Sequence, residues 1–417
     1  MRRTKRPAPW WQRFVAAGAF GAAVGLAIGL VPVTTSVASA ASSGQQAAEI
    51  RSIVRSAMAA DHLRSVIVRV TIGNTPVITQ AFGSSLTGVP ATTSMNFRNG
   101  AVAFSYVGTL LMEFVDEHKL SLSDPISKWE PSLPEASQVT VKMLADMTSG
   151  YPDYVTDPAF LAAFNADPFR PITVAERLAY AFSRPISFAP GTNWGYAHTN
   201  YMILGQILSD VGKKPLATLL RNKVLRPLGL NHTVAFANAQ IPSPVLHAYD
   251  SERRPALGIP PTTPFYEEST YFDPVWGTPT GANETTNIYD MTKTAVGVGT
   301  GKLLSKSSYQ AMTGPNLLGF GTKQANCSCF PQVNIYNYGI GIVRSGSWLL
   351  QNPLYGGYAA TEAYSPSQKI AIAVAVTFGP GAFDAQGNYN NSSDDIFRAI
   401  GKYLAPNAAP PLPPSAS

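Results

Sequence analysis

The chain has 417 residues, of which 45% are hydrophobic and 13% charged, enough to form a folded protein with a substantial buried core. Its net charge of +6 comes almost entirely from residues 1–40, which hold five basic residues and no acid; the remainder carries 26 basic and 25 acidic residues. Such a balanced remainder gives no electrostatic support to nucleic-acid binding, so we exclude nucleic acid as a partner.

The first 40 residues have the pattern of an export signal. A basic stretch precedes the apolar run 14–30, and Ala38-Ser39-Ala40 provides the small residues of a cleavage site. The alternative is an uncleaved anchor, since this run could almost span a bilayer, and membrane contact is expected only in that case. Arg2-Arg3 is a weak sign of the twin-arginine route, and no cysteine for a lipid anchor lies near the cut. We predict a signal peptide over 1–40 and a secreted, cell-envelope or periplasmic protein.

The following segments alternate between helical and strand patterns. A helix is predicted over 45–62, then two strands over 65–72 and 76–83, which the short link at Asn74 would join as a hairpin. A helix over 105–119 has apolar residues at three- and four-residue spacing. Further helices are expected over the ranges 140–150, 173–184 and 199–230, the last interrupted at Gly212 and Pro215.

Residues 251–285 are rich in Pro, Thr and Gly, and we predict a long functional or covering loop there. After it come predicted strands, a last helix and a disordered Pro-rich tail, over the ranges 335–344, 347–350, 357–364, 369–378, 391–404 and 405–417. Strands at both ends of a helical middle indicate an α/β (α+β) sandwich. We predict one domain over 45–404, with a sheet lobe at about 45–100 and 330–404 and a helical lobe at about 101–330.

The two cysteines, Cys327 and Cys329, are two positions apart. In an extended strand their side chains would point to opposite faces, so a mutual disulfide requires a tight turn; pairing and non-pairing both stay open. We predict no metal site, because none of the five histidines lies beyond His247 and two thiolates alone make a poor zinc site.

Four stretches occur in a distinctive order: "LSLSDPISKWEPSLP" from residue 120, "VTVKMLADMTSGYPDY" from 139, "FAPGTNWGYAHTNYMILGQIL" from 188 and "VLRPLGLNHT" from 224. Together they closely resemble the serine β-lactamase-related family of class C β-lactamases, D-alanyl-D-alanine carboxypeptidases and related esterases, over roughly residues 50–404. The resemblance implies a β-lactamase/transpeptidase-like fold, in which N- and C-terminal helices flank an antiparallel sheet and a cleft separates it from an inserted helical lobe. It implies no cofactor.

The first motif of that family, Phe-Arg-x-Gly-Ser-x-x-Lys, provides a serine nucleophile at a helix start and a lysine that activates it. Here those two positions hold Ala101 and Phe104, and no Ser-x-x-Lys occurs anywhere in the chain. A helix start suits a nucleophile because its unpaired N–H groups stabilise developing negative charge. We predict that Phe104 packs into and closes the former active site; the alternative is that it lines a ligand groove.

The other two family motifs are altered as well. In the second, Tyr-x-Asn, this chain has Tyr196-Ala197-His198, so the tyrosine is the only family residue kept. Tyr196 is a candidate residual base and His198 could titrate near neutrality, although a structural role is the commoner one for each. In the third motif, a basic residue or histidine followed by one variable residue and glycine, the chain has Gln351, Asn352 and Pro353, and the proline removes a backbone N–H from the expected oxyanion wall.

Three further charged residues lie outside the motifs. Lys302 and Arg344 could bind an anion, but a solvated surface position is the commoner role for both. Glu362 lies in a mostly apolar strand, and we predict that it faces solvent.

Three functions remain open. The joint loss of serine, lysine and amide favours an exported pseudoenzyme without acyl-enzyme chemistry, which binds or regulates at the cell envelope; cell-wall peptide or an envelope protein would be the partner by family analogy. The first alternative is a weak peptidase, esterase or β-lactamase-like hydrolase in which Tyr196 and His198 activate water. The second is a structural envelope protein with a closed cleft. We predict that the chain is not an enzyme.

Overall fold

A computed structural model describes residues 42–413, except residues 74, 237 and 275–276. The predicted signal peptide and the predicted turn residue Asn74 lie outside the described residues. Among the helices of the described part, none combines the length and apolar character needed to cross a membrane.

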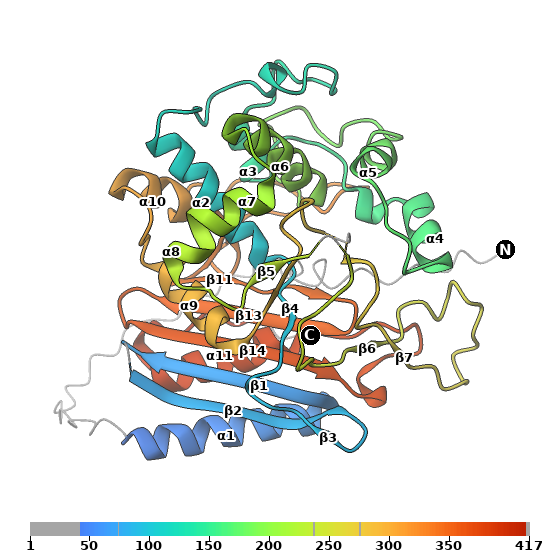
Figure 1. Cartoon of the computed structure of the whole chain (residues 1–417), viewed down its shortest axis with the longest axis vertical. Helices are drawn as coiled ribbons and strands as arrows, with labels where there is room; N and C mark the ends of the chain where they lie inside the picture. The colour runs from blue at the N-terminus through green and yellow to red at the C-terminus, as the bar shows by residue number, and fades with distance from the viewer. Residues whose placement is uncertain (1–41, 74, 237, 275–276, 414–417) are drawn as a thin grey trace, which may run out of the picture.

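An antiparallel sheet of nine strands forms one half of the molecule (Figure 1). Its strand order is β3-β2-β1-β14-β13-β11-β10-β9, and β12 pairs with β13. The central strand β14 is buried along its whole length, so both faces of the sheet must be covered. The predicted hairpin is confirmed, since β1 and β2 pair antiparallel. The strands are β1 (Leu63–Ile72), β2 (Thr75–Leu86), β3 (Val89–Pro90), β9 (Asn337–Tyr338), β10 (Val343–Ser345), β11 (Trp348–Gln351), β12 (Leu354–Tyr355), β13 (Tyr358–Ser365) and β14 (Ile370–Phe378).

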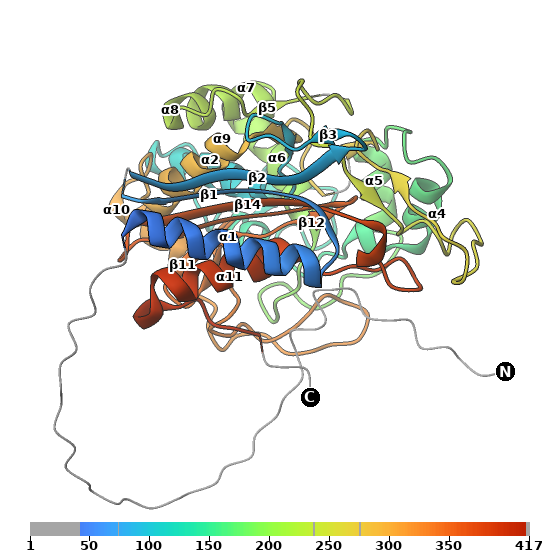
Figure 2. The same ribbon diagram turned by 90° about the horizontal axis from the view of Figure 1, so that it is seen from below.

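The first and last helices, α1 (Ser43–Ala60) and α11 (Ser392–Leu404), cover one face of the sheet (Figure 2). Both begin at a side-chain cap. The Ser42 side chain accepts a hydrogen bond from the backbone N–H of Gln45, and the Gln45 side chain accepts one from the backbone N–H of Ser42. The Asn391 side chain accepts a hydrogen bond from the backbone N–H of Asp394. The predicted fold, an antiparallel sheet flanked by the terminal helices, is confirmed.

The other face of the sheet carries α9, which packs on β13 and β14, and beyond it the remaining helices. The predicted interruption of the long helical segment is confirmed, because α6 ends at Gly212 and α7 begins just after Pro215. The helices on this side are α2 (Val102–Asp116), α3 (Val141–Ala145), α4 (Pro158–Ala166), α5 (Val174–Ala181), α6 (His198–Gly212), α7 (Leu216–Leu220), α8 (Arg226–Leu228), α9 (Ile288–Gly299) and α10 (Lys306–Thr313).

Two small sheets are present besides the nine-stranded sheet. One has the order β4-β8-β5, from β4 (Phe97–Arg98), β8 (Glu284–Thr286) and β5 (Val234–Ala235), and the other pairs β6 (Tyr249–Asp250) with β7 (Glu267–Glu268). The predicted loop 251–285 is largely irregular but contains β7 and the start of β8. The β4–β8 pairing matters for function, because it joins the chain just before α2 to the chain just before α9.

The structure corrects two predictions and answers one open question. The tail was predicted to be disordered, but residues 405–413 pack on the domain: Trp348 donates a hydrogen bond to the Ala408 carbonyl at 2.7 Å, and the buried Arg398 donates one to the Pro411 carbonyl. The predicted strand 335–344 is divided into β9 and β10 by a bend. The question of cysteine pairing is answered, since Cys327 and Cys329 form a disulfide.

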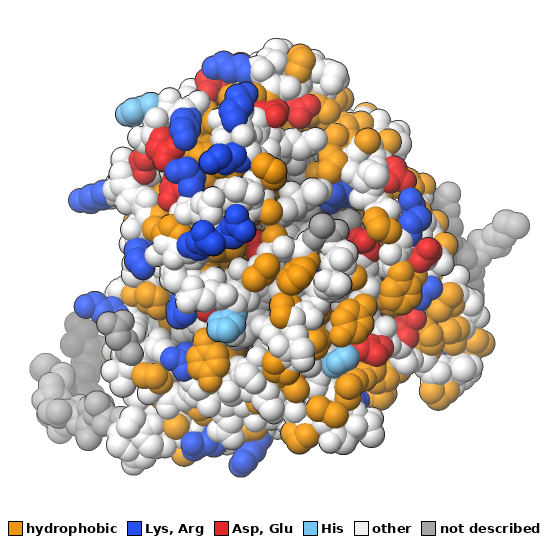
Figure 3. All heavy atoms as spheres, viewed as in Figure 1, with side chains coloured by type: hydrophobic (Ala, Val, Ile, Leu, Met, Phe, Trp, Pro, Cys, Tyr) orange, Lys and Arg blue, Asp and Glu red, His pale blue; other side chains and the backbone are white. Residues whose placement is uncertain are grey.

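The face of the molecule in Figure 3 has mixed charge. Basic and acidic side chains are interspersed towards its upper left, and hydrophobic side chains gather towards its lower right (Figure 3). Phe169, Leu257 and Tyr271 are among the exposed large hydrophobic residues of the described chain.

Candidate functional site

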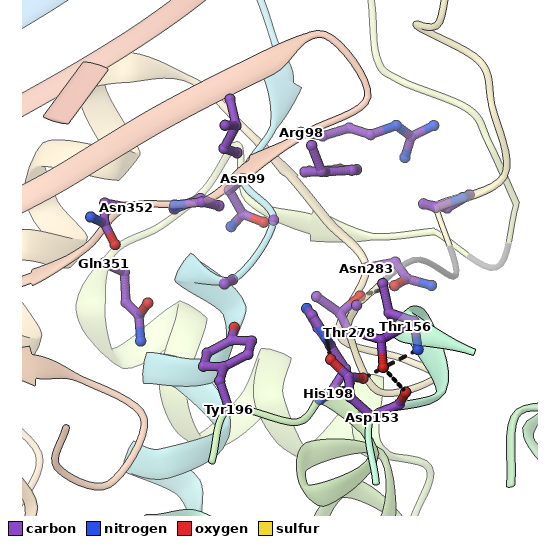
Figure 4. A pocket seen from close by; sticks show the side chains of 18 of the residues that line it. Arg98, Asn99, Asp153, Thr156, Tyr196, His198, Thr278, Asn283, Gln351 and Asn352 are labelled. Carbon is purple, nitrogen blue, oxygen red and sulfur yellow. Dashed lines mark hydrogen bonds and ion pairs between the residues drawn. The ribbon is translucent and has the colours of Figure 1, made fainter. Parts of the chain in front are cut away.

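A cavity of about 470 Å³ opens where the start of α2, the start of α6, the β4–β8 ladder and the end of β11 meet (Figure 4). This volume is within the range of small-molecule binding sites. Much of the wall is apolar or aromatic, with polar groups at a few points; the apolar and aromatic residues include Val155, Leu161, Phe330, Tyr336, Pro353, Leu354 and Tyr355. The alternative of a closed cleft is therefore wrong for this structure.

Ala101 lies on the cavity wall at the N-cap of α2, where it presents only a methyl group. The preceding Gly100 has φ +51°, and a Cβ atom there would lie 2.8 Å from Cβ of Pro353 and 2.9 Å from the ring of Tyr355. Glycine thus allows the start of α2 to approach the chain after β11. The structure brings the first and third motif positions together through this contact.

Phe104 does not line the cavity. Its side chain is fully buried and stacks on Tyr201, with ring centroids 4.1 Å apart. It lies behind two cavity residues, at 6.3 Å from the ring of Tyr196 and 6.2 Å from that of His198. The prediction that Phe104 is a packing residue is confirmed, but the prediction that it closes the cleft is wrong, because the ring fills the layer beneath the cavity wall.

His198 forms a close pair with Asp153 on the opposite side of the cavity from Gln351 (Figure 4). The ring atom Nδ1 of His198 lies 2.9 Å from Oδ2 of Asp153, and its backbone N–H donates to Oδ1 at 3.1 Å. Asp153 therefore fixes the orientation of the imidazole and leaves Nε2 for other contacts. We did not predict Asp153; its only sequence signal is its place at the end of the phrase 139–154.

Tyr196 points its hydroxyl into the cavity, and its ring centroid lies 5.0 Å from that of His198 (Figure 4). Burial raises the pKa of Tyr196 well above its usual value. The phenol therefore keeps its proton at neutral pH, and a group of this kind is a poor general base.

The third motif positions form the opposite wall. Gln351 is buried and its Nε2 donates to the Gly341 carbonyl at 2.7 Å, while Nδ2 of Asn352 donates to Asp394 at 3.1 Å. Pro353 has no N–H to offer. The side-chain donors at this edge are thus engaged with the protein itself, which weakens it as an oxyanion site.

Two polar residues that we did not predict, Asn99 and Glu284, also line the cavity. They are 0% and 2% exposed, and among the described residues neither side chain has a hydrogen-bond partner. Burial raises the pKa of Glu284 to about 8. Asn99 lies inside the first motif phrase, but no sequence pattern marks Glu284.

The remaining charged candidates lie away from the cavity. Glu362 was predicted to face solvent, but it is 1% exposed, because β13 is covered on both faces. Burial raises its pKa well above the ordinary value. Lys302 is exposed and donates to the Pro227 carbonyl at 3.2 Å, and Arg344 is half-buried. Within the described chain, no three His, Cys, Asp or Glu side chains are placed to hold a metal ion.

Glu284→Gln will change how stability depends on pH. The folded protein keeps a proton on Glu284 up to pH about 8, whereas the unfolded chain loses it near the ordinary glutamate pKa. The fold binds the extra proton in this window, so wild-type stability falls as pH rises through it, by up to ~1.4 kcal/mol per pH unit. Urea unfolding at pH 5 to 8 should show this slope reduced in the variant. An unchanged slope would show that Glu284 ionises normally.

Comparison with known proteins agrees with this architecture. A family model described as Beta-lactamase matches residues 50–393, so the chain belongs to the β-lactamase family, whose fold is that of serine hydrolases. A penicillin-binding protein of Bacillus subtilis (strain 168) is 26% identical over 146 residues, covering 34% of this chain and 31% of the relative. The chain spans half or less of the length of the curated relatives it matches.

Solved structures with the same fold cover nearly the whole domain. The D-amino acid amidase of Ochrobactrum anthropi SV3, in complex with L-phenylalanine amide, has a TM-score of 0.70 and 20% identity, covering 87% of this chain and 99% of its own. A D-stereospecific amidohydrolase from Streptomyces sp. has a TM-score of 0.69 and 20% identity, covering 85% and 98%. At 20% identity, these similarities establish the fold and nothing more specific.

Proposed function

We propose that this chain is a non-catalytic member of the β-lactamase family that binds a ligand in its cleft at the cell envelope. The observation that carries the proposal is the methyl group of Ala101, which stands at the helix start on the wall of an open cavity. Acyl-enzyme chemistry requires an oxygen or sulfur nucleophile at such a place. Export rests on the pattern of residues 1–40, and cell-wall peptide is the ligand suggested by the family.

No covalent adduct should form when the protein is incubated with penicillins or with an active-site phosphonate, because position 101 has no atom to acylate or phosphonylate. Intact-mass spectrometry checks this directly, with an active penicillin-binding protein treated in parallel as the positive control. A stoichiometric mass increase that maps to a serine of the cleft would overturn the proposal.

A weak hydrolase is the second candidate, and the pair of Asp153 and His198 is the observation that favours it. A histidine oriented by a carboxylate is a common general base, and such a base contributes about 10²–10⁴-fold to a rate. Against it stand the protonated Tyr196 and the occupied donors at Gln351 and Asn352.

His198→Gln should leave the slow hydrolysis of an activated ester such as p-nitrophenyl acetate unchanged, because we expect that reaction to be background. His232→Gln, at a position that does not line the cavity, is the matched control. A decrease of about 100-fold in the His198 variant alone would establish the hydrolase instead.

A further inference from the structure

The cavity contains one acid and one amide whose hydrogen-bonding capacity the described protein does not use. Both oxygens of Glu284 and both polar atoms of the Asn99 side chain are buried without a partner among the described residues. Buried polar groups are normally paired, because leaving them unpaired costs the desolvation energy of the group. Two such residues on one cavity wall therefore indicate that a ligand completes them.

The β4–β8 ladder holds these two residues beside each other. Phe97 pairs with Thr286 and Arg98 with Thr285, and the backbone N–H of Asn99 donates to the Glu284 carbonyl at 3.4 Å. Residues opposed in an antiparallel pair have Cβ atoms about 4.5–5.5 Å apart. One small group in the cavity can thus contact both side chains.

The other charges of the cavity are already engaged or exposed. The carboxylate of Asp153 is taken up by His198, and the Arg98 guanidinium donates to the carbonyls of Ala239 at 2.6 Å and Thr270 at 3.4 Å. Glu252 also lines the cavity: its side chain reaches solvent, while desolvation and the neighbouring Asp250 raise the pKa of its carboxyl to about 8. Of these carboxyls, that of Glu284 is both almost fully buried and without a partner among the described residues, and it attracts a positive charge once it has lost its proton.

We propose that the cleft selects ligands that carry a primary ammonium group next to an apolar body, and that Glu284 and Asn99 receive the ammonium. An ammonium has three N–H donors and no acceptor, which matches the Glu284 oxygens and Oδ1 of Asn99. Hydrogen bonds between charged partners are roughly twice as strong as neutral ones. The apolar walls accept the rest of the ligand. This inference rests on the proposed ligand-binding function and names its chemical class.

The test is calorimetric titration of the mature protein with phenethylamine, with 2-phenylethanol as the neutral comparator and 3-phenylpropionate as the anionic one. At pH 8.5 an alkylammonium is still charged, while Glu284 is largely ionised. The amine should bind at least tenfold more tightly than the alcohol, and the anion more weakly than either.

Variants separate the proposed contact from general effects. Glu284→Gln should reduce the affinity for the amine to that for the alcohol, and Asn99→Leu should reduce it several-fold. Glu362→Gln is the matched control, because Glu362 is also buried and has an unpaired oxygen but does not line the cavity; it should keep the preference.

The outcomes distinguish the two proposals. Equal binding of amine and alcohol, or loss of the preference in both glutamate variants, would overturn the ammonium site and leave cleft binding intact. Tighter binding of the anion would assign recognition to Arg98 and would also overturn the ammonium site. No binding of any of the three compounds would overturn the site together with the small-molecule form of cleft binding. A covalent adduct with penicillin would overturn only the non-catalytic assignment.

Discussion

Phe104→Ala will lower the free energy of unfolding by about 3–5 kcal/mol, the usual cost of removing a large buried aromatic side chain. Phe104 has no exposed surface and stacks on Tyr201 at 4.1 Å, so its removal loses both transfer energy and ring contact. The surrounding helices α2 and α6 cannot collapse fully into the space. Urea unfolding of the mature domain measures the loss, and an unchanged slope would confirm that the same surface is exposed in both proteins.

Phe169→Ala is the control for this experiment. It removes the same side chain from a surface position, since Phe169 is 61% exposed. It should change stability by no more than about 0.5 kcal/mol. A loss under about 1 kcal/mol for Phe104→Ala would contradict the burial of this ring and would favour the groove-lining alternative.

Restoring the family residues with Ala101→Ser and Phe104→Lys will not restore ordinary activity. The new lysine would lie in the fully buried site of Phe104, where desolvation lowers the pKa of an amine and favours its neutral form. The substrate amide would still meet His198, which is held by Asp153, and a wall in which Gln351 is engaged and Pro353 has no N–H. Loss of one oxyanion donor alone costs about 10²–10³ in rate.

Hydrolysis of a chromogenic cephalosporin measures this deficit, with an active penicillin-binding protein as the reference and Ala101→Ser alone as the matched control. We expect the double variant to remain at least 100-fold below the reference. Turnover within tenfold of the reference would show that the third motif does not lie at residues 351–353 or that its wall is still functional.

The amino-acid pattern was sufficient for the main elements and for the family. Apolar spacing and turn residues are local properties of the sequence. The spacing predicted the helix that became α2, the short link at Asn74 predicted the β1–β2 hairpin, and Gly212 and Pro215 predicted the break between α6 and α7. The substitutions at Ala101 and Phe104 are visible in the motif itself, since the flanking residues keep their register.

Burial and side-chain partners depended on contacts between distant segments, which local spacing does not contain. Glu362 is a lone charged residue in a mostly apolar strand and was expected to face solvent, yet α9 and the neighbouring strands cover it. Residues 405–413 pack on the domain because the carbonyls of Ala408 and Pro411 accept hydrogen bonds from Trp348 and Arg398.

The cavity shows most clearly the difference between features that local sequence predicts and features that depend on tertiary packing. Asn99 and Glu284 are separated by nearly half the chain and meet only through the two-residue strands β4 and β8, which are too short to leave a pattern. The side chain of Phe104 lies beneath the wall, on Tyr201, and does not enter the cleft, because the packing of α2 on α6 sets its direction. Motif spacing identified which residues had changed, while the packing of separate elements determined that a cavity with an unpaired acid remains between them.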